Sequence, residues 1–297
     1  MKKDLLIGYA SNYDKSVLCF WINSIRKTDF KGDVAILGSN LTEETIHYIQ
    51  SKKVKIFQHE NIMDNSVPHV ERFLYLYLFL KKYIDKYENV ISTDTKDVIF
   101  QSNPSLWLKE NLNTKKLVVS SECLKYKDEP WNDQNLMETF GQLTYEEMKN
   151  FTIYNVGVIA GKIVDVMELF KFIFYLSQNR TVQIVDQAVF NFIIQTETVG
   201  NKTLFTSNRD KWAVNLAVCN DAVRIGSGHV GQKCANNMKF YSEYRKNYMD
   251  DQPIFDRKGT VKSKDGTPFV IVHQWNRIPG FNGIDNLKEK IMKEFGD

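Results

Sequence analysis

The segment of greatest chemical interest places two carboxylates and a lysine directly after a strand pattern. Residues 89–93 form that pattern, and Asp94, Lys96 and Asp97 follow at once. In open α/β sheets, ligands bind outside the carboxyl ends of the strands. Carboxylates at such an edge can hold a divalent cation, which in turn binds a diphosphate. The same residues also fit a solvated turn in which Asp97 caps the segment that follows.

Other polar residues stand at the ends of predicted elements. They are Gly8-Tyr9-Ala10 after the first apolar run, Arg72 at the start of a long helix, Asn155 in an apolar run, Asp186-Gln187 at a helix start, and His273 and Arg277 after a late apolar run. Each also has an ordinary structural interpretation. Asn155 fits a buried, hydrogen-bonded amide, and Asp186 fits an acid favoured by the helix dipole. Arg72 fits a surface ion pair, and a lone His273 fits a core histidine.

Taken in order, these segments resemble GT-A glycosyltransferases, in particular retaining family 8-like enzymes. Asp94-Thr95-Lys96-Asp97 is similar to a variant D-x-[R/K]-D motif, with Lys96 in the place of the second acid. Residues 154–158 resemble an F-N-x-G-V segment, and Asp186-Gln187 resembles the D-Q pair of retaining transferases. The resemblance spans residues 4–277 and implies an α/β fold of GT-A type. That fold is a Rossmann-like mixed sheet flanked by helices, here with a loop-rich C-terminal portion.

The resemblance also implies the roles of individual residues. A divalent metal, Mn²⁺ or Mg²⁺, is expected at Asp94, Asp97 and His273, although Lys96 is an alternative neutraliser of phosphate. The implied donor-binding residues are Gly8, Tyr9, Ala10, Arg72, Asp94, Lys96, Asp97 and Arg277. The implied catalytic residues are Asn155, Asp186 and Gln187. Glu122 and Trp131 are expected to meet the acceptor, with Trp131 offering a face for a sugar ring.

The implied reaction moves a sugar from a nucleotide-diphosphate sugar to a hydroxyl of a glycan, lipid or protein. The Asp186-Gln187 pair favours retention of configuration, whereas inversion requires a base such as Asp186 or Glu122. One alternative is a sugar-nucleotide pyrophosphorylase, but the first strand lacks the Gly-rich, Arg-containing loop of that class. Another alternative is a non-catalytic nucleotide-sugar-binding protein, which the irregular acidic motif favours.

Hydrophobic periodicity predicts the elements that position these residues. Strands are predicted at 5–9, 34–37, 54–57, 89–93, 117–121, 152–160 and 269–273. Helices are predicted at 17–25, from Thr42, and at 69–87, 164–176, 182–194 and 286–295. Residues 122–135 are predicted to form a polar loop, and 198–264 to be rich in loops. The alternation implies a mostly parallel sheet covered on both faces. We expect a single domain over 1–297, with a nucleotide-sugar-binding half (1–104) and an acceptor-binding half (105–297).

Composition excludes several classes of protein. The chain has 297 residues, 43% hydrophobic and 25% charged, which excludes disorder as the main state. The net charge of +3 does not indicate a nucleic-acid partner. The longest apolar run, 73–80, is far shorter than the ~20 residues of a membrane span. With no export signal and four cysteines without metal-ligand spacing, we expect a reduced, cytoplasmic protein.

Two further motifs are rejected. Residues 226–231 fit G-x-G-x-x-G, but no helix pattern follows, so we predict a loop. Cys219, His229 and Cys234 match no common zinc spacing.

Overall fold

The computed structural model describes residues 2–60, 67–219, 253–256, 258–277 and 287–296. The first elements are β1 (Lys3–Ser11), α1 (Lys15–Lys27), β2 (Asp33–Ser39), α2 (Glu43–Ser51), β3 (Lys55–Gln58), α3 (Pro68–Lys82), β4 (Tyr87–Asp94), β5 (Val98–Phe100) and α4 (Pro104–Asn111). They are followed by β6 (Leu117–Lys125), η1 (Tyr126–Asp128), α5 (Pro130–Phe140), α6 (Gln142–Met148), β7 (Thr152–Lys162), α7 (Ile163–Leu176), α8 (Asp186–Gln195), α9 (Glu197–Gly200) and β8 (Thr203–Thr206). The last are η2 (Asn208–Asp210), β9 (Ala213–Asn215), η3 (Leu216–Cys219), β10 (Ile254–Phe255), β11 (Val261–Lys262), β12 (Ile271–His273), η5 (Trp275–Arg277) and α13 (Leu287–Phe295).

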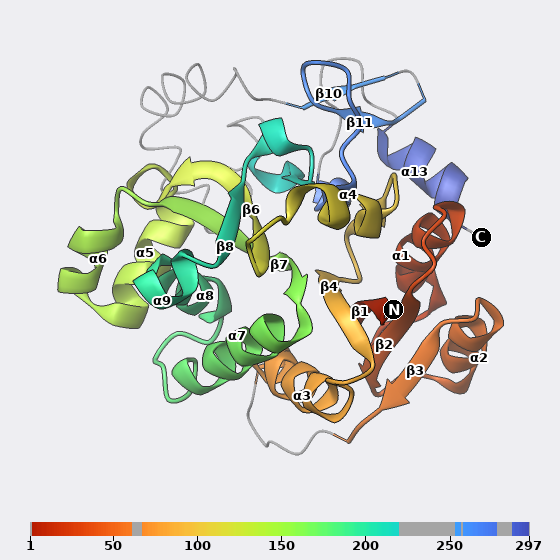
Figure 1. Ribbon diagram of the computed structural model, residues 1–297, viewed down its shortest axis with the longest axis horizontal. Helices are drawn as coiled ribbons and strands as arrows, with labels where there is room; N and C mark the ends of the chain where they lie inside the picture. Colours follow the sequence, from red (N-terminus) through yellow and green to blue (C-terminus); the bar gives the residue numbers. More distant parts are fainter. Residues whose placement is uncertain (1, 61–66, 220–252, 257, 278–286, 297) are drawn as a thin grey trace.

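A seven-stranded mixed sheet runs through the molecule in the order β3-β2-β1-β4-β7-β6-β8 (Figure 1). The first four strands are parallel, as expected. Strand β7 is antiparallel to both β4 and β6, whereas β6 and β8 are parallel to each other. Within this sheet β7 alone runs against the other strands, so the expectation of a mostly parallel sheet is confirmed. Since β6 and β7 are antiparallel neighbours, the chain leaves β6 and enters β7 at the same edge of the sheet. Helices α5 and α6 lie between the two strands in sequence. The predicted mixed sheet of GT-A type is confirmed.

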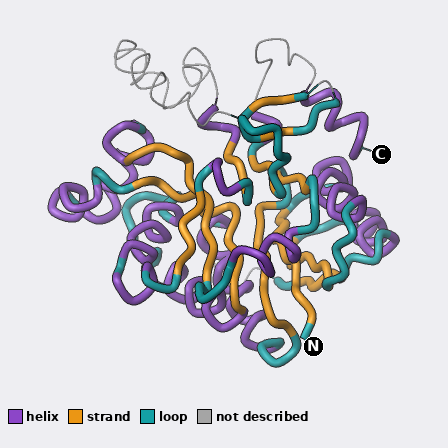
Figure 2. Tube along the Cα trace, turned by 45° about the horizontal axis from the view of Figure 1, so that its top comes forward, coloured by secondary structure: helices purple, strands orange, loops and turns teal. Residues whose placement is uncertain are grey.

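Helices cover both faces of this sheet, as Figure 2 shows with strands in orange and helices in purple. On β1, Leu5 and Ile7 belong to the hydrophobic cluster of α3, α7 and α8. Leu6, between them, packs in the opposite cluster with α1 and α2. Strand side chains alternate between faces, so one apolar strand supplies both layers. Each such fully buried aliphatic side chain contributes about 1.5–3 kcal/mol.

A second sheet of three strands, β5-β12-β9, brings distant segments of the chain together. His273 of β12 pairs with Val98 of β5 on one side and with Asn215 of β9 on the other. Val98 directly follows Asp97, so this pairing places His273 beside the acidic turn. Strand register therefore decides the geometry of the candidate site.

The sequence-based boundaries were wrong at three places. The long helix ends at Lys82, and Tyr87 already begins β4. The predicted helix at 182–194 begins only at Asp186. The predicted polar loop over 122–135 is instead the end of β6, a 3₁₀ turn and the start of α5. Glu129 caps α5 through the backbone N–H groups of its first turn, and Pro130 suits the first helical position.

Among the helices that the structure describes, none combines the length and apolar character needed to cross a membrane.

Gly161 of β7 tests the packing of the sheet. Its φ is +151°, and an added Cβ would lie 2.1 Å from the carbonyl oxygen of Lys116. We expect Gly161→Ala to lower the free energy of unfolding by at least about 3 kcal/mol, because a clash adds to backbone strain. Gly266→Ala is the matched control, since Gly266 has φ +84° and nothing within 4 Å of an added Cβ. Its expected loss is about 1–2 kcal/mol. Equal losses in urea denaturation would contradict the packing argument.

Candidate active site

Asp94, Asp97 and His273 converge at the carboxyl end of β4. His273 Nε2 lies 3.4 Å from Asp94 Oδ2 and 3.5 Å from Asp97 Oδ1. Among the residues that the structure describes, these three form the one group of acidic, His or Cys side chains with ligand atoms within 4.8 Å of one another. Thr95 is buried and Lys96 is exposed, so the turn directs both acids inward and the lysine outward. The candidate site thus contains the three residues that the sequence assigned to a metal.

Asn215 holds the imidazole of His273 in place. His273 Nδ1 lies 2.8 Å from Asn215 Oδ1, and Asn215 Nδ2 donates to Ser121 O at 3.0 Å. Because the Asn215 amide nitrogen is already donating, its oxygen accepts from Nδ1–H. In the neutral ring the lone pair is then on Nε2, the nitrogen that faces the acids. Metal-bound histidines are oriented by such a bond at the other ring nitrogen.

The Nε2 atom of His273 is buried and has no hydrogen-bond partner. The His273 side chain is 2% exposed. Burial would lower its pKa, but the charges of Asp97 and Asp94 outweigh burial and raise the pKa to about 9. A buried polar atom without a partner needs an explanation. Two carboxylates and an imidazole nitrogen are a donor set suited to Mn²⁺, and a divalent cation between them would satisfy all three.

Gly157 makes room for this group. A Cβ on Gly157 would lie 2.6 Å from His273 Cε1 and 2.7 Å from Asp94 Oδ2. Strand β7 runs antiparallel to β4, and the pairing of Val158 with Thr93 places Gly157 beside Asp94. Any side chain here would displace two of the three candidate ligands.

Two arginines hold the outer carboxylate oxygens. Arg72 donates to Asp94 Oδ1 through Nη1 and to Asp186 Oδ2 through Nη2, the latter at 3.0 Å. Arg277 donates to Asp97 Oδ2 at 3.2 Å. Burial would raise the pKa of Asp94, but Arg72 and His273 lower it below its ordinary value. Burial raises the pKa of Asp186 despite Arg72. Arg72, predicted to bind the donor, is therefore committed to two carboxylates.

The end of β1 packs directly against the acidic turn. A Cβ on Gly8 would lie 2.2 Å from Thr95 Cγ2, and Thr95 Oγ1 donates to Tyr9 O at 2.8 Å. Tyr9 is half-buried and stacks on His59, with ring centroids 5.5 Å apart. Ala10 is fully buried in the core, so its side chain does not line a site. Gly8 thus permits the close approach of β1 to the acids.

A network of buried amides and carboxylates adjoins the triad. Glu122 Oε1 accepts from Asn155 Nδ2 at 2.7 Å and from Gln187 Nε2 at 3.2 Å. Glu122 is 5% exposed, so the structure places this predicted acceptor residue in the interior. Trp131, in the first turn of α5, is half-buried.

Sequence reasoning missed Glu129, Asn132 and Asn215. Asn132 Oδ1 accepts from Gln187 Nε2 at 2.8 Å, and Asn132 Nδ2 donates to Glu129 Oε2 at 2.8 Å. The acid followed by Pro130 was an available sign of a helix start. Asn215 had no local signal, because its role depends on the pairing of β9 with β12.

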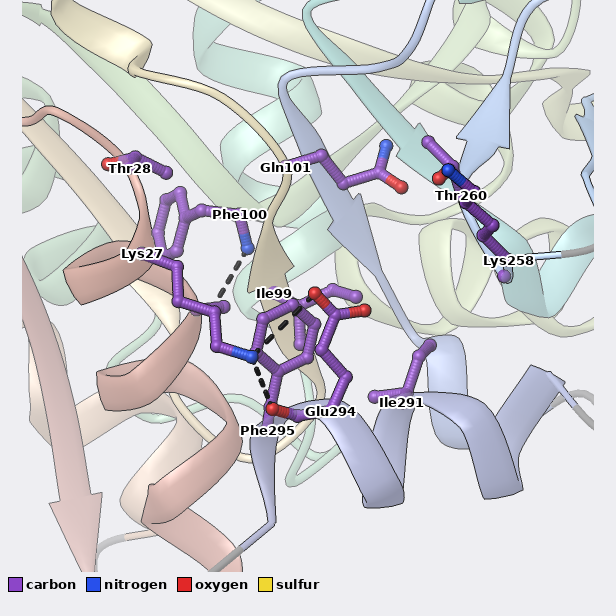
Figure 3. A pocket seen from close by; sticks show the side chains of 12 residues that line it. Lys27, Thr28, Ile99, Phe100, Gln101, Lys258, Thr260, Ile291, Glu294 and Phe295 are labelled. Carbon is purple, nitrogen blue, oxygen red and sulfur yellow. Dashed lines mark hydrogen bonds and ion pairs between the residues drawn. The ribbon is translucent and has the colours of Figure 1, made fainter.

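A separate cavity of about 220 Å³ lies between α1, β5 and α13 (Figure 3). Two of its polar groups are engaged within the protein: Lys27 binds Glu294, and the Ser24 hydroxyl accepts from Phe100 N at 3.1 Å. None of the triad residues lines it. The rejected G-x-G-x-x-G segment, His229 and Cys234 lie outside the described residues, while Cys19 and Cys123 form no disulfide within the part of the chain that the structure describes.

Comparison with solved structures relates this architecture to glycosyltransferases. WbbM, a bifunctional glycosyltransferase solved without ligand, superposes with a TM-score of 0.59 at 13% sequence identity, over 100% of this chain and 50% of that chain. This chain thus spans half the length of WbbM. A crystal structure of an active-site mutant of LgtC gives a TM-score of 0.55 at 12% identity, over 98% of this chain and 95% of that one. No protein-family model and no curated protein sequence matches. At these identities the likeness establishes the fold.

Glu122 provides a test of the buried network through pH. Burial, with the charge of Glu129, raises the pKa of Glu122 from 4.5 to about 7. Folding therefore takes up a proton between these values, so this group's contribution to stability is present at low pH and is lost as pH rises through 7. We expect the unfolding free energy of wild type relative to Glu122→Gln to fall by about 3 kcal/mol from pH 4.5 to 8.

The exposed Glu110→Gln is the control for this comparison. Its difference from wild type should show no such fall. A flat difference for Glu122→Gln in urea titrations across the range would mean that Glu122 folds ionised.

Proposed function

We propose that this protein is a metal-dependent glycosyltransferase that transfers a sugar from a nucleotide-diphosphate sugar to a hydroxyl acceptor. One observation carries the proposal: the buried Nε2 of His273, which makes no hydrogen bond, faces two carboxylates at the carboxyl end of β4. That end lies next to β1, where the sheet order reverses, and such switch points are ligand sites in α/β folds. The likeness to WbbM, a bifunctional glycosyltransferase, and the fold shared with LgtC support this class of reaction.

Asp94, Asp97 and His273 would hold Mn²⁺ or Mg²⁺. The metal, when bound, supplies positive charge that stabilises a departing nucleoside diphosphate. Arg277 has a half-exposed side chain beside Asp97 and can bind phosphate oxygens in a bidentate manner. Exposed Lys96 adds positive potential at the same turn. Gly8 and Tyr9 end the neighbouring strand and would lie near the nucleoside.

Retention of configuration fits the buried carboxylates better than inversion. Inversion needs a carboxylate base that reaches the acceptor hydroxyl. Asp186 is 3% exposed and bound to Arg72, and Glu122 Oε1 already accepts two amide hydrogen bonds. Neither presents a free carboxylate to an incoming hydroxyl. Asn155 and Gln187 are the side chains that would orient the donor sugar, and Trp131 the acceptor.

A ligand panel tests the donor class. The protein is heated with UDP-, GDP-, CMP- or dTDP-sugars, each with and without Mn²⁺, and the melting temperature is recorded. A ligand at 100 times its Kd stabilises the folded state by about 2.7 kcal/mol. We expect one nucleotide class to raise the melting temperature in the presence of Mn²⁺, with sugar transfer or hydrolysis detected for that compound. No shift from any nucleotide sugar would refute the proposal.

Asp97→Asn tests the acidic group. The variant keeps the shape of the side chain and an oxygen for Arg277, but it removes one anionic ligand. We expect kcat to fall at least about 100-fold, the loss typical of removing one charge-stabilising group. Asp165→Asn on α7 is the control, because Asp165 pairs with Lys202 away from the triad. Full activity of the Asp97 variant would remove it from the metal site.

Gly157→Ala tests the space beside His273. The new methyl group would push against His273 and Asp94, so we expect Mn²⁺ affinity by calorimetry to fall at least about tenfold. Gly157 is not a ligand, so unchanged Mn²⁺ binding in a folded variant would contradict the metal geometry. Circular dichroism and the melting temperature report whether the variant is folded.

A further inference from the structure

A chain of buried hydrogen bonds links the start of α5 to Gln187. Glu129 Oε2 accepts from Asn132 N at 2.7 Å and from Asn132 Nδ2 at 2.8 Å. Asn132 Oδ1 then accepts from Gln187 Nε2 at 2.8 Å. Glu129 and Asn132 are 8% and 5% exposed. Water therefore competes little for these bonds.

The direction of this chain is determined at its start. A backbone N–H can only donate, so the Asn132 N–H holds Glu129 Oε2 as an acceptor. The Asn132 side chain must then turn its NH₂ group toward Glu129 and its carbonyl oxygen toward Gln187. Gln187 in turn must donate, and it also donates to Glu122 Oε1 at 3.2 Å.

The carbonyl oxygen of Gln187 is consequently turned toward β7. There Gln187 Oε1 accepts a long hydrogen bond from Val156 N at 3.4 Å, which uses one of the two lone pairs of the oxygen. Val156 directly precedes Gly157. Because Gly157 has no side chain, His273 and Asp94 lie close to its backbone. The second lone pair of Gln187 Oε1 thus remains available next to the segment of β7 that adjoins the triad.

We propose that Asn132, held by Glu129, is a positioning residue that turns the Gln187 carbonyl oxygen toward the bound sugar, where it accepts a hydrogen bond from a sugar hydroxyl. The identity of the bound molecule rests on the proposed function. Asn132 itself touches no substrate in this scheme. Its effect is to fix which end of the Gln187 amide faces the site.

The bond network is tested without any turnover. In ¹⁵N-glutamine-labelled protein, the side-chain NH₂ of Gln187, assigned with Gln187→Glu, should exchange slowly with solvent because both hydrogens are bonded. In Asn132→Ala this protection should fall at least about tenfold, since one acceptor is lost. Gln101 is the internal control, because its NH₂ donates to Val261 O and Phe269 O, each at 2.8 Å, outside the network.

Kinetics with the nucleotide sugar that is turned over in the panel test the role in transfer. We expect Asn132→Ala to lower kcat at least about tenfold, with donor KM and the affinity for Mn²⁺ changed less than about twofold. Asn132→Asp keeps an acceptor toward Gln187, so it should retain slow exchange of Gln187 and a higher kcat than Asn132→Ala. It also places a third carboxyl group beside Glu129 and Glu122, so its melting temperature should be no higher.

A merely structural role would make kcat follow the melting temperature across both variants. Asn103→Ala, which removes a buried cap from α4, controls for lost stability alone and should keep wild-type kcat. Unchanged Gln187 exchange in Asn132→Ala, or altered exchange with unchanged kcat, would overturn the proposal. Absence of turnover by wild type with every nucleotide sugar would instead refute the proposed function. The positioning role of Asn132 in transfer would then also be refuted, whereas the exchange experiment would still report on the hydrogen-bond network.

Discussion

The buried carboxylate of Asp97, next to the half-buried carboxylate of Asp94, needs compensating charge that water cannot supply. Asp97 is 4% exposed, and charges removed from water require close partners. Three elements distant in sequence bring those partners: α3 contributes Arg72, β12 contributes His273, and η5 contributes Arg277. The small sheet β5-β12-β9 positions two of these partners, because His273 ends β12 and Arg277 follows in η5. The need to compensate these charges thus connects the end of β4 to β12 and η5, which lie more than 170 residues later in the sequence.

Strand β7 joins the charged triad to a second network in which hydrogen-bond direction is the organising property. Asn155 belongs to the network, whereas Gly157 adjoins the triad. In the hydrogen-bond chain, Glu129 accepts from the Asn132 side-chain amide, and the oxygen of that amide accepts from Gln187. A buried network of this type rigidifies a site only when its members are satisfied. The charges suit a cation and a diphosphate, and the amides suit neutral hydroxyl groups.

The fold is shared with WbbM and LgtC at 13% and 12% identity, and a likeness at that level does not identify a ligand. A sheet of this kind supplies an open edge at the carboxyl ends of its strands, and function depends on the side chains placed there. Here those side chains include His273, whose Nε2 is buried, makes no hydrogen bond and lies 3.4 and 3.5 Å from two carboxylates. The side-chain oxygen of Asn215 accepts a hydrogen bond from the other ring nitrogen, Nδ1.

Local patterns in the sequence predicted the first four strands, the position of Asp94 and Asp97 at a strand end, and His273 at the end of a late strand, because apolar periodicity is a local property. The long-range pairings had to come from the folded chain: β12 pairs between β5 and β9, β7 runs antiparallel, and residues 122–135 form the end of β6, a 3₁₀ turn and the start of α5. The partners that neutralise Asp97 or orient Gln187 lie 180 and 55 residues away in sequence. No local pattern records such pairings, since they arise from strand register and from the need to satisfy buried polar groups.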